Sequence, residues 1–219
     1  MRVKQYGKVI FILTKSYEVV NWLIREFEVS FLKKQNILQA ATKSFTIFGY
    51  KATTMSQIAK QANVGKGTIY TFFKNKEELF DEIINNMITE MKFLAEQSIR
   101  DEDSFIEKAH KGIEVFIAFH NEHELTIKLL QEQKEIGTTI VHDALKRLNH
   151  SIILYIQKKI EEAIAKKEIV ECDPEITALV MFRLYTTLKI DWEKEHEALS
   201  PKKITELFNF YILNGLSKG

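Results

Sequence analysis

Apolar residues recur every three or four positions along most of this chain, which is the spacing of one face of an α-helix. The clearest early stripe begins after Lys33 and consists of Ile37, Ala40, Ala41, Phe45 and Phe48. Gly49 follows that stripe, at the place where a helix C-cap is expected. No segment shows the rhythm of short strands and turns, so the pattern predicts an all-α fold.

Residues 54–79 contain two shorter apolar stripes separated by a sharp turn. Thr54 and Gln57 have the spacing of a capping box, which marks the start of a helix. Asn63 and Gly65 tolerate the left-handed backbone that a tight turn requires. The inner faces of the two helices consist of Ile58, Ala59, Ala62, Ile69 and Phe73. This succession predicts a helix-turn-helix motif.

Helical spacing continues from Leu79 to the end of the chain. A turn is expected at residues 120–122, His120-Asn121-Glu122. Asp173-Pro174 and Ser200-Pro201 each place an N-cap residue before a proline in the first helical position. The last two helices are therefore expected near residues 174–195 and 201–216.

Charge is distributed unevenly, although 31 Lys and Arg residues nearly balance 30 Asp and Glu residues. No acid occurs from Val29 to Lys76, a run that carries Lys33, Lys34, Lys43, Lys51, Lys60, Lys66, Lys74 and Lys76. From Glu77 onward the acids outnumber Lys and Arg. A basic run that coincides with a helix-turn-helix favours a polyanionic partner, namely DNA, over a merely solvated lysine surface.

Residues 1–32 form an extension whose role the pattern leaves open. Their apolar positions follow one seam of an amphipathic helix that would pack on its own chain, a partner or a membrane surface: Leu13, Tyr17, Val20, Ile24, Phe27 and Phe31. Alternatively, translation starts later and the segment is not part of the protein. A third interpretation, ranked below these two, is a basic DNA-binding arm formed by Arg2, Lys4 and Lys8.

The remaining sequence argues against an enzyme and against a membrane span. The lone Cys172 excludes an internal disulfide and fits the cytoplasm. No stretch approaches the ~20 apolar residues of a membrane-spanning helix. The chain contains no glycine-rich phosphate fingerprint and no nucleophile elbow. His120 and His123 have a spacing that can bring two metal ligands together, but no third ligand is identifiable, so we expect neither metal nor cofactor.

The stretch from Ile37 to Leu79 resembles the DNA-binding domain of TetR/AcrR-type bacterial transcriptional regulators. The resemblance depends on Ile37-Leu38-x-Ala40-Ala41-x3-Phe45-x3-Gly49-Tyr50-x-Ala52-Thr53-Thr54, followed by Ile58-Ala59-x2-Ala62-x-Val64-x2-Gly67-Thr68-Ile69-Tyr70-x-Phe72-Phe73-x2-Lys76-Glu77-x-Leu79. Two positions depart from the family pattern. Asn63 stands where Gly is usual, and Gly65 stands where Ser or Thr is common, which removes a helix cap and a hydroxyl contact to phosphate.

The resemblance implies three domains: the extension at 1–32, a DNA-binding domain at 33–80, and a larger effector-binding and dimerisation domain at 81–219. It also implies that the helix from about Lys66 to Phe72 lies in the major groove of a palindromic operator. Lys66, Thr68 and Thr71 are then the candidates for base contacts. The full set of expected DNA-binding residues is Thr53, Thr54, Gly65, Lys66, Gly67, Thr68, Tyr70, Thr71 and Lys76.

By the same analogy, the second domain encloses a pocket for a small apolar effector and forms a homodimer through its last two helices. The expected pocket residues are Phe116, Phe119, His120, Leu129, Tyr155, Phe182, Tyr185 and Trp192. The expected dimer residues are Phe182, Tyr185, Leu188, Phe208, Tyr211 and Ile212. Residues of the pocket types belong more often to a core than to a pocket, and the alternative for the dimer set is a deep core within one chain.

The sequence therefore predicts a ligand-responsive DNA-binding regulator, most simply a repressor. A DNA-organising or cell-division protein without an effector would use the same scaffold. A protein-interaction adaptor is the third class, which the intact basic run argues against. The sequence names neither the effector nor the operator, and activation instead of repression stays open.

Overall fold

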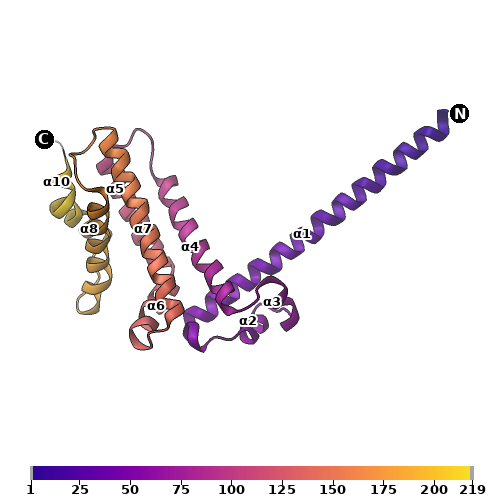
Figure 1. Ribbon diagram of the computed structural model, residues 1–219, viewed down its shortest axis with the longest axis horizontal. Coiled ribbons are helices and arrows are strands. Elements are labelled where there is room, and N and C mark those ends of the chain that lie inside the picture. The colour runs from indigo at the N-terminus through magenta and orange to yellow at the C-terminus, as the bar shows by residue number, and fades with distance from the viewer. Residues whose placement is uncertain (1, 218–219) are drawn as a thin grey trace. The chain divides into compact units, whose positions relative to one another are not determined.

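The computed structural model describes residues 2–217, with side chains from residue 20 onward, and is almost entirely helical (Figure 1). Within these residues no strand forms, and one isolated β-bridge joins Ile169 to Ser217. The all-α prediction is confirmed. The chain divides into two compact units: residues up to Phe48 with Ala52–Leu79, and Gly49–Lys51 with the residues from Phe80 onward.

The first unit contains most of α1 (Arg2–Ala52), all of α2 (Met55–Gln61) and all of α3 (Lys66–Phe72). Its core forms where the apolar stripes of these helices meet, and its fully buried members are Ile37, Ala41, Phe45, Ile58, Ile69, Phe73 and Leu79. Ser44 is buried among them and donates a hydrogen bond from Oγ to Gln61 Oε1 at 2.6 Å, which ties α1 to α2. The apolar stripe of α1 therefore packs into this core as its spacing predicted, except that Phe48 is exposed.

The early part of α1 carries exposed apolar side chains. Val20, Ile24 and Phe31 are about half exposed, and Phe27 is 72% exposed, so this stretch of the expected seam is not packed on other described residues. The side chains of Leu13 and Tyr17, and those of the basic Arg2, Lys4 and Lys8, lie outside the described ones. The choice among the interpretations of residues 1–32 therefore stays open.

The second unit is a helical bundle. Its elements are α4 (Lys76–Ser98, of which residues from Phe80 belong here), α5 (Phe105–Glu122), α6 (Glu124–Glu135), α7 (Thr139–Ala165), α8 (Pro174–Thr186), η1 (Thr187–Asp191), η2 (Trp192–Lys194), α9 (Pro201–Phe208), η3 (Asn209–Leu213) and α10 (Asn214–Leu216). α7 packs against both α6 and α8, and α5 packs against α9. The core that they share includes Ile113, Ile160, Met181, Ile204 and Phe208.

Most helix ends lie where the local sequence predicted them. Asp173 and Ser200 cap α8 and α9 with their side chains, and each is followed by proline, as expected. The turn predicted at residues 120–122 is wrong, because α5 continues through Glu122. His123 ends it, since both its main-chain N–H and its Nδ1 lie within hydrogen-bonding distance of the Phe119 carbonyl. The last two helices are also less regular than predicted, because each changes to a π-helical turn, at η1 and η3.

Residues 49–51, at the end of α1, are held by a buried carboxylate of α6. Glu132 is 4% exposed and accepts hydrogen bonds from the main-chain N–H groups of Tyr50 at 2.5 Å and Lys51 at 3.0 Å. The hydroxyl of Thr138 donates a third bond at 2.9 Å. Gly49 has φ 81°, and a Cβ placed on it would lie 2.6 Å from Glu132 Oε2. Glycine is therefore required at this position both by its backbone conformation and by its neighbour.

Candidate nucleic-acid interface and ligand cavity

The helix-turn-helix begins with a complete capping box. Gln57 N–H donates to Thr54 Oγ1 at 3.3 Å, and Thr54 N–H donates to Gln57 Oε1 at 2.8 Å, so two otherwise unpaired donors at the start of α2 are satisfied. The turn that follows has Asn63 in the left-handed region, with φ 53°. The capping box and the replacement of the usual glycine by Asn63 are confirmed. Gly65, the other residue expected to allow a left-handed backbone, instead has an extended conformation with φ −65°.

α3 buries one side and exposes the other. Ile69 and Phe73 are essentially inaccessible, which fixes the helix against the core of the first unit. The outer side consists of Lys66, Gly67, Tyr70 and Thr71, and Thr68 is half-buried beside it. The exposed face thus offers the Lys66 ammonium group and the Tyr70 phenol as donors to phosphate or to base edges. The Thr71 hydroxyl donates to the Thr68 carbonyl at 2.7 Å, so on this face its oxygen is an acceptor and its methyl group an apolar contact.

The two glycines at the start of α3 are not required by packing. Gly65 is the N-cap and provides no side-chain cap, as its departure from the family pattern predicted. A Cβ on Gly67 would meet no atom within 4 Å. Glycine inside a helix is less stable than alanine, and no described neighbour requires it here, so packing within the chain does not explain Gly67.

Two of the expected phosphate contacts have internal roles. Thr53 is 1% exposed, and its hydroxyl donates to the Ser44 carbonyl at 3.2 Å, so that hydroxyl is not available at the surface. Lys76 donates from Nζ to the Thr53 carbonyl at 2.8 Å, which ties the first residue of α4 to the segment between α1 and α2. Thr54 remains exposed beside them.

The lysines around this motif leave it strongly positive. Lys60, Lys66 and Lys74 are exposed, and no carboxylate within the described part of the chain forms an ion pair with them. Exposed lysines without carboxylate partners, such as these three, suit the binding of a phosphate backbone, because binding releases the counterions of the nucleic acid.

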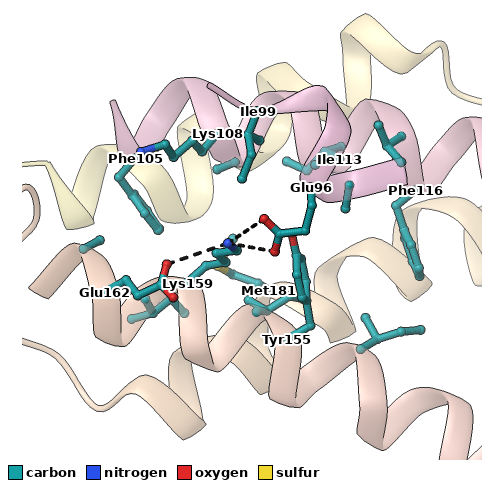
Figure 2. Close-up of a pocket in the computed structure, with 18 of the residues that line it drawn as sticks. Glu96, Ile99, Phe105, Lys108, Ile113, Phe116, Tyr155, Lys159, Glu162 and Met181 are labelled. Carbon is teal, nitrogen blue, oxygen red and sulfur yellow. Dashed lines mark hydrogen bonds and ion pairs between the residues drawn. The ribbon is translucent and has the colours of Figure 1, made fainter. Parts of the chain in front are cut away.

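The second unit contains a cavity of about 270 Å³ between α4, α5, α7, α8 and α9 (Figure 2). Most of its wall is apolar. Phe116, Tyr155, Phe182 and Tyr185, four of the expected pocket residues, line it. A concave, mostly apolar space that also contains polar groups is the usual form of a small-molecule site, although this one is slightly smaller than most.

The other four expected pocket residues lie elsewhere. Leu129 is buried in the core, Trp192 stacks on His196 with ring centres 3.9 Å apart, and Phe119 stacks on His123 at 3.8 Å. His120 is half-buried near Tyr185 but does not reach the cavity, and its pKa is lowered by burial and by the charge of Lys189. These residues are packing residues, as the alternative reading of the apolar stripes allowed.

A charged cluster in the cavity wall was not predicted from the sequence. Lys159 on α7 points between Glu96 on α4 and Glu162 on its own helix (Figure 2). Its Nζ lies 2.8 Å from Glu96 Oε1 and 3.7 Å from Glu162 Oε2, and 5.4 Å from the Tyr155 ring centre. Burial opposes the ionisation of Glu96, but the hydrogen bond and the charge of Lys159 together lower its pKa.

The two tyrosines of the cavity remain protonated. Burial raises the pKa of Tyr155, and the negative charge of Glu96 raises it further. Burial and the charge of Glu193 do the same for Tyr185, whose hydroxyl lies 3.5 Å from the Phe116 carbonyl. Both are hydrogen-bonding phenols and not candidate nucleophiles.

The expected dimer residues divide into buried and exposed ones. Phe182, Tyr185 and Phe208 are at most 4% exposed within the single chain, and Leu188 and Ile212 are half-buried. Tyr211 is 63% exposed. The other strongly exposed apolar side chains of α8 and η3 are Ile176, Leu179, Val180 and Phe210.

No group of three His, Cys, Asp or Glu side chains among residues 20–217 is placed to hold a metal ion. No helix there combines the length and apolar character needed to cross a membrane.

Comparison with known proteins connects these features to one family. The profile described as "Bacterial regulatory proteins, tetR family" matches residues 37–83. The HTH-type transcriptional regulator YhgD of Bacillus subtilis (strain 168) is 51% identical over 185 residues, which cover 84% of this chain and 97% of that protein.

Two solved structures share the fold. One, a proposed fatty acid metabolism regulator of Clostridium perfringens, is 25% identical with a TM-score of 0.65 and covers 84% of this chain and 100% of its own. The other, SmeT in complex with triclosan, has a TM-score of 0.69 at 20% identity and covers 85% of this chain and 92% of its own. With the helix-turn-helix and the sequence identity to YhgD, these comparisons establish that the chain belongs to the TetR family of bacterial transcriptional regulators.

Proposed function

We propose that this regulator is a ligand-responsive repressor, which binds a palindromic operator as a homodimer and is released by a small apolar effector in the bacterial cytoplasm. The observation that supports sequence-specific binding is the outer face of α3, where Lys66, Gly67, Tyr70 and Thr71 are exposed within a run free of acids. An α-helix presenting such donors fits the major groove, which carries the distinct base patterns.

The residues of the motif divide by task. Lys66, Thr68 and Thr71 are the proposed readers of base edges, with Lys66 also able to neutralise phosphate. Thr54 and Tyr70 are the proposed phosphate contacts, which set the register on the operator. Lys76 and Thr53 contribute from inside, because their hydrogen bond fixes the loop before α2. Half-sites about one helical turn apart, ~10 bp, suit a two-fold dimer.

The direct test combines genome-wide mapping of bound DNA with affinity measurements on the strongest site. Lys66→Ala should weaken binding, and the slope of log K against log salt should become shallower by about one per lysine removed. Lys146→Ala, an exposed lysine on α7, is the matched control and should change neither quantity. An unchanged affinity of the Lys66→Ala variant would show that this lysine does not contact DNA. Failure of the protein to bind any duplex at low salt would refute the proposed function.

The effector part of the proposal is supported by the cavity, which favours ligand control over a DNA-organising role without an effector. The description of the C. perfringens relative points to acyl compounds. The test is a screen for compounds that release the protein from its mapped operator. Binding spread broadly over the genome, with no compound able to release it, would favour the organising role instead.

The dimer part is supported by the apolar surface left on α8 and η3. Ile176 and Phe210 are 60% and 72% exposed. Several large apolar side chains exposed on the same elements are typical of an interaction surface. Val180→Glu should place a charge in this surface and shift the protein toward the monomer in sedimentation analysis, with loss of operator binding. If the mass of that variant is unchanged, the dimer interface does not include this surface.

A further inference from the structure

The wall of the cavity contains both apolar and charged side chains, and the charged ones indicate which class of ligand it can bind. Much of it is formed by buried apolar side chains, including Phe105, Ile113, Met181 and Phe208. The charged side chains of Glu96, Lys159 and Glu162 lie among them, between Phe105 and Phe116 (Figure 2). A ligand that contacts both kinds of side chain is an amphiphile, with an apolar tail and a polar head.

The carboxylates nearest the apolar part are already compensated. Glu96 accepts two contacts from Lys159 Nζ, at 2.8 and 3.0 Å. Glu162 lies 3.7 Å from the same ammonium group and 3.9 Å from that of Lys158. Two carboxylates and two ammonium groups thus form a balanced cluster, which leaves little unopposed negative charge to attract a cationic ligand.

The remaining charges along the wall are mostly positive. The cations are Lys92, Arg100, Lys108 and Lys166, against the acids Asp101 and Glu168. Within residues 20–217 no carboxylate pairs with Lys92, Lys108 or Lys166, and Lys108 donates only to the Asp101 carbonyl, at 3.3 Å. An anion entering the cavity therefore meets a favourable potential.

Lys159 is the cation best placed to hold that anion. Its side chain is 24% exposed, so a charge-assisted hydrogen bond there is stronger than one at the surface. Glu96 is 48% exposed and can turn into water when another anion replaces it, so the exchange keeps the charge balance and leaves no buried carboxylate without a partner.

We propose that the cavity binds an amphiphile with an anionic head group, carboxylate or phosphate, and that the head displaces Glu96 from Lys159 while the tail lies among the apolar side chains. The exchange removes an ion pair that joins α4 to α7. This inference rests on the proposed role of the cavity as the effector site.

Titration calorimetry of the full chain with four ligands that share one tail tests the head group: decanoate, decyl phosphate, decan-1-ol and decylammonium. At least one anion should bind about tenfold more tightly than the alcohol and the cation, and the tighter of the two anions identifies the head. Equal or tighter binding of decan-1-ol or decylammonium overturns the inference, and so does the absence of binding by all four.

Variants of the ion pair should act in opposite directions. Glu96→Gln removes the competing carboxylate and should raise the affinity for the anionic ligand several-fold. Lys159→Met should lower it about tenfold without changing the affinity for decan-1-ol, and Lys159→Arg should retain most of it. Lys146→Met, at an exposed position of the same helix outside the cavity wall, is the control and should have no effect. Equal anion affinity of the Met and Arg variants at Lys159, or a loss with Glu96→Gln, contradicts the exchange.

These measurements need no DNA, which separates the two proposals. Anion binding without release from the operator leaves the ligand class standing and refutes effector control. Release by compounds that carry no negative charge supports effector control and refutes the ligand class.

Discussion

The carboxylate of Glu132 gives the sharpest test of how the second unit holds residues 49–51. Glu132→Ala removes the acceptor of three hydrogen bonds, from Tyr50 N–H, Lys51 N–H and the Thr138 hydroxyl. A hydrogen bond to a charged group contributes about 1.5–3 kcal/mol. Tyr50 is 5% exposed, so its bond should account for most of the loss, whereas the groups of Lys51 and Thr138 are closer to water and recover part of theirs.

The expected loss in the free energy of unfolding is about 2–4 kcal/mol, which is less than the sum of three such bonds. The reduction has a physical cause: a buried carboxylate is itself unfavourable, and alanine relieves that penalty. Glu132→Gln keeps the shape and one acceptor oxygen but turns an amide N–H₂ toward a donor. Its expected loss is about 1–2 kcal/mol, between wild type and alanine.

Urea unfolding followed by far-ultraviolet circular dichroism, at one fixed protein concentration, measures these differences. Gln131→Ala is the matched control, because this neighbour on α6 is exposed and its removal should stay within about 0.5 kcal/mol of wild type. If Glu132→Ala also stays within about 0.5 kcal/mol, or if the Gln variant is the less stable of the two, the three hydrogen bonds do not hold this segment.

Three further predictions follow from single sites. Gly49→Ala should destabilise the fold by at least about 1–2 kcal/mol in the same urea assay, because φ is positive and Glu132 occupies the space of the new methyl group. Gly67→Ala should keep or slightly raise stability while it weakens operator binding roughly tenfold in a gel-shift titration; equal DNA affinity would show that no phosphate approaches this backbone. The lowered pKa of Glu96 implies stability that is fully present above its unfolded value of 4.5 and is lost as pH falls through the folded value. The stability advantage over Glu96→Gln should therefore vanish in acid, and an advantage unchanged by acid would contradict the ion pair with Lys159.

The helix-turn-helix could be predicted almost completely because its determinants are local. The capping box joins residues three apart, the turn depends on the backbone of Asn63, and the buried faces repeat with the helical period. What could not be predicted was the burial of Thr53, because its partner Ser44 lies on the preceding helix and only the packing of that helix brings the two together.

The cavity was predicted only in part, since a period of 3.6 residues identifies a buried face but not what that face touches. Phe116 and Phe119 lie one turn apart on α5, yet Phe116 lines the cavity and Phe119 stacks on His123. Leu129 is buried as expected, but on α6, which does not line the cavity. Distinguishing core from cavity requires the arrangement of five helices, which no local pattern encodes.

Two largely buried lysines, Lys189 and Lys159, show which ion pairs can be predicted from the sequence and which cannot. Lys189 is 9% exposed and pairs at 2.7 Å with Glu193, four residues later, where η1 has given way to η2. The spacing of four residues is enough to predict the partner of this buried charge. Lys159 interrupts the apolar stripe of α7 between Ile156 and Ala163, which already marks it as a charge that needs a partner. Glu162, three residues later on α7 and 3.7 Å away, follows from spacing. The closer partner, Glu96, is 63 residues away, and only the packing of α4 on α7 supplies it. An ion pair between two helices can be broken by moving one of them or by a competing ion, whereas partners a few residues apart in the chain move together. The Lys159 pair, and not the Lys189 pair, is therefore the one through which a ligand can act.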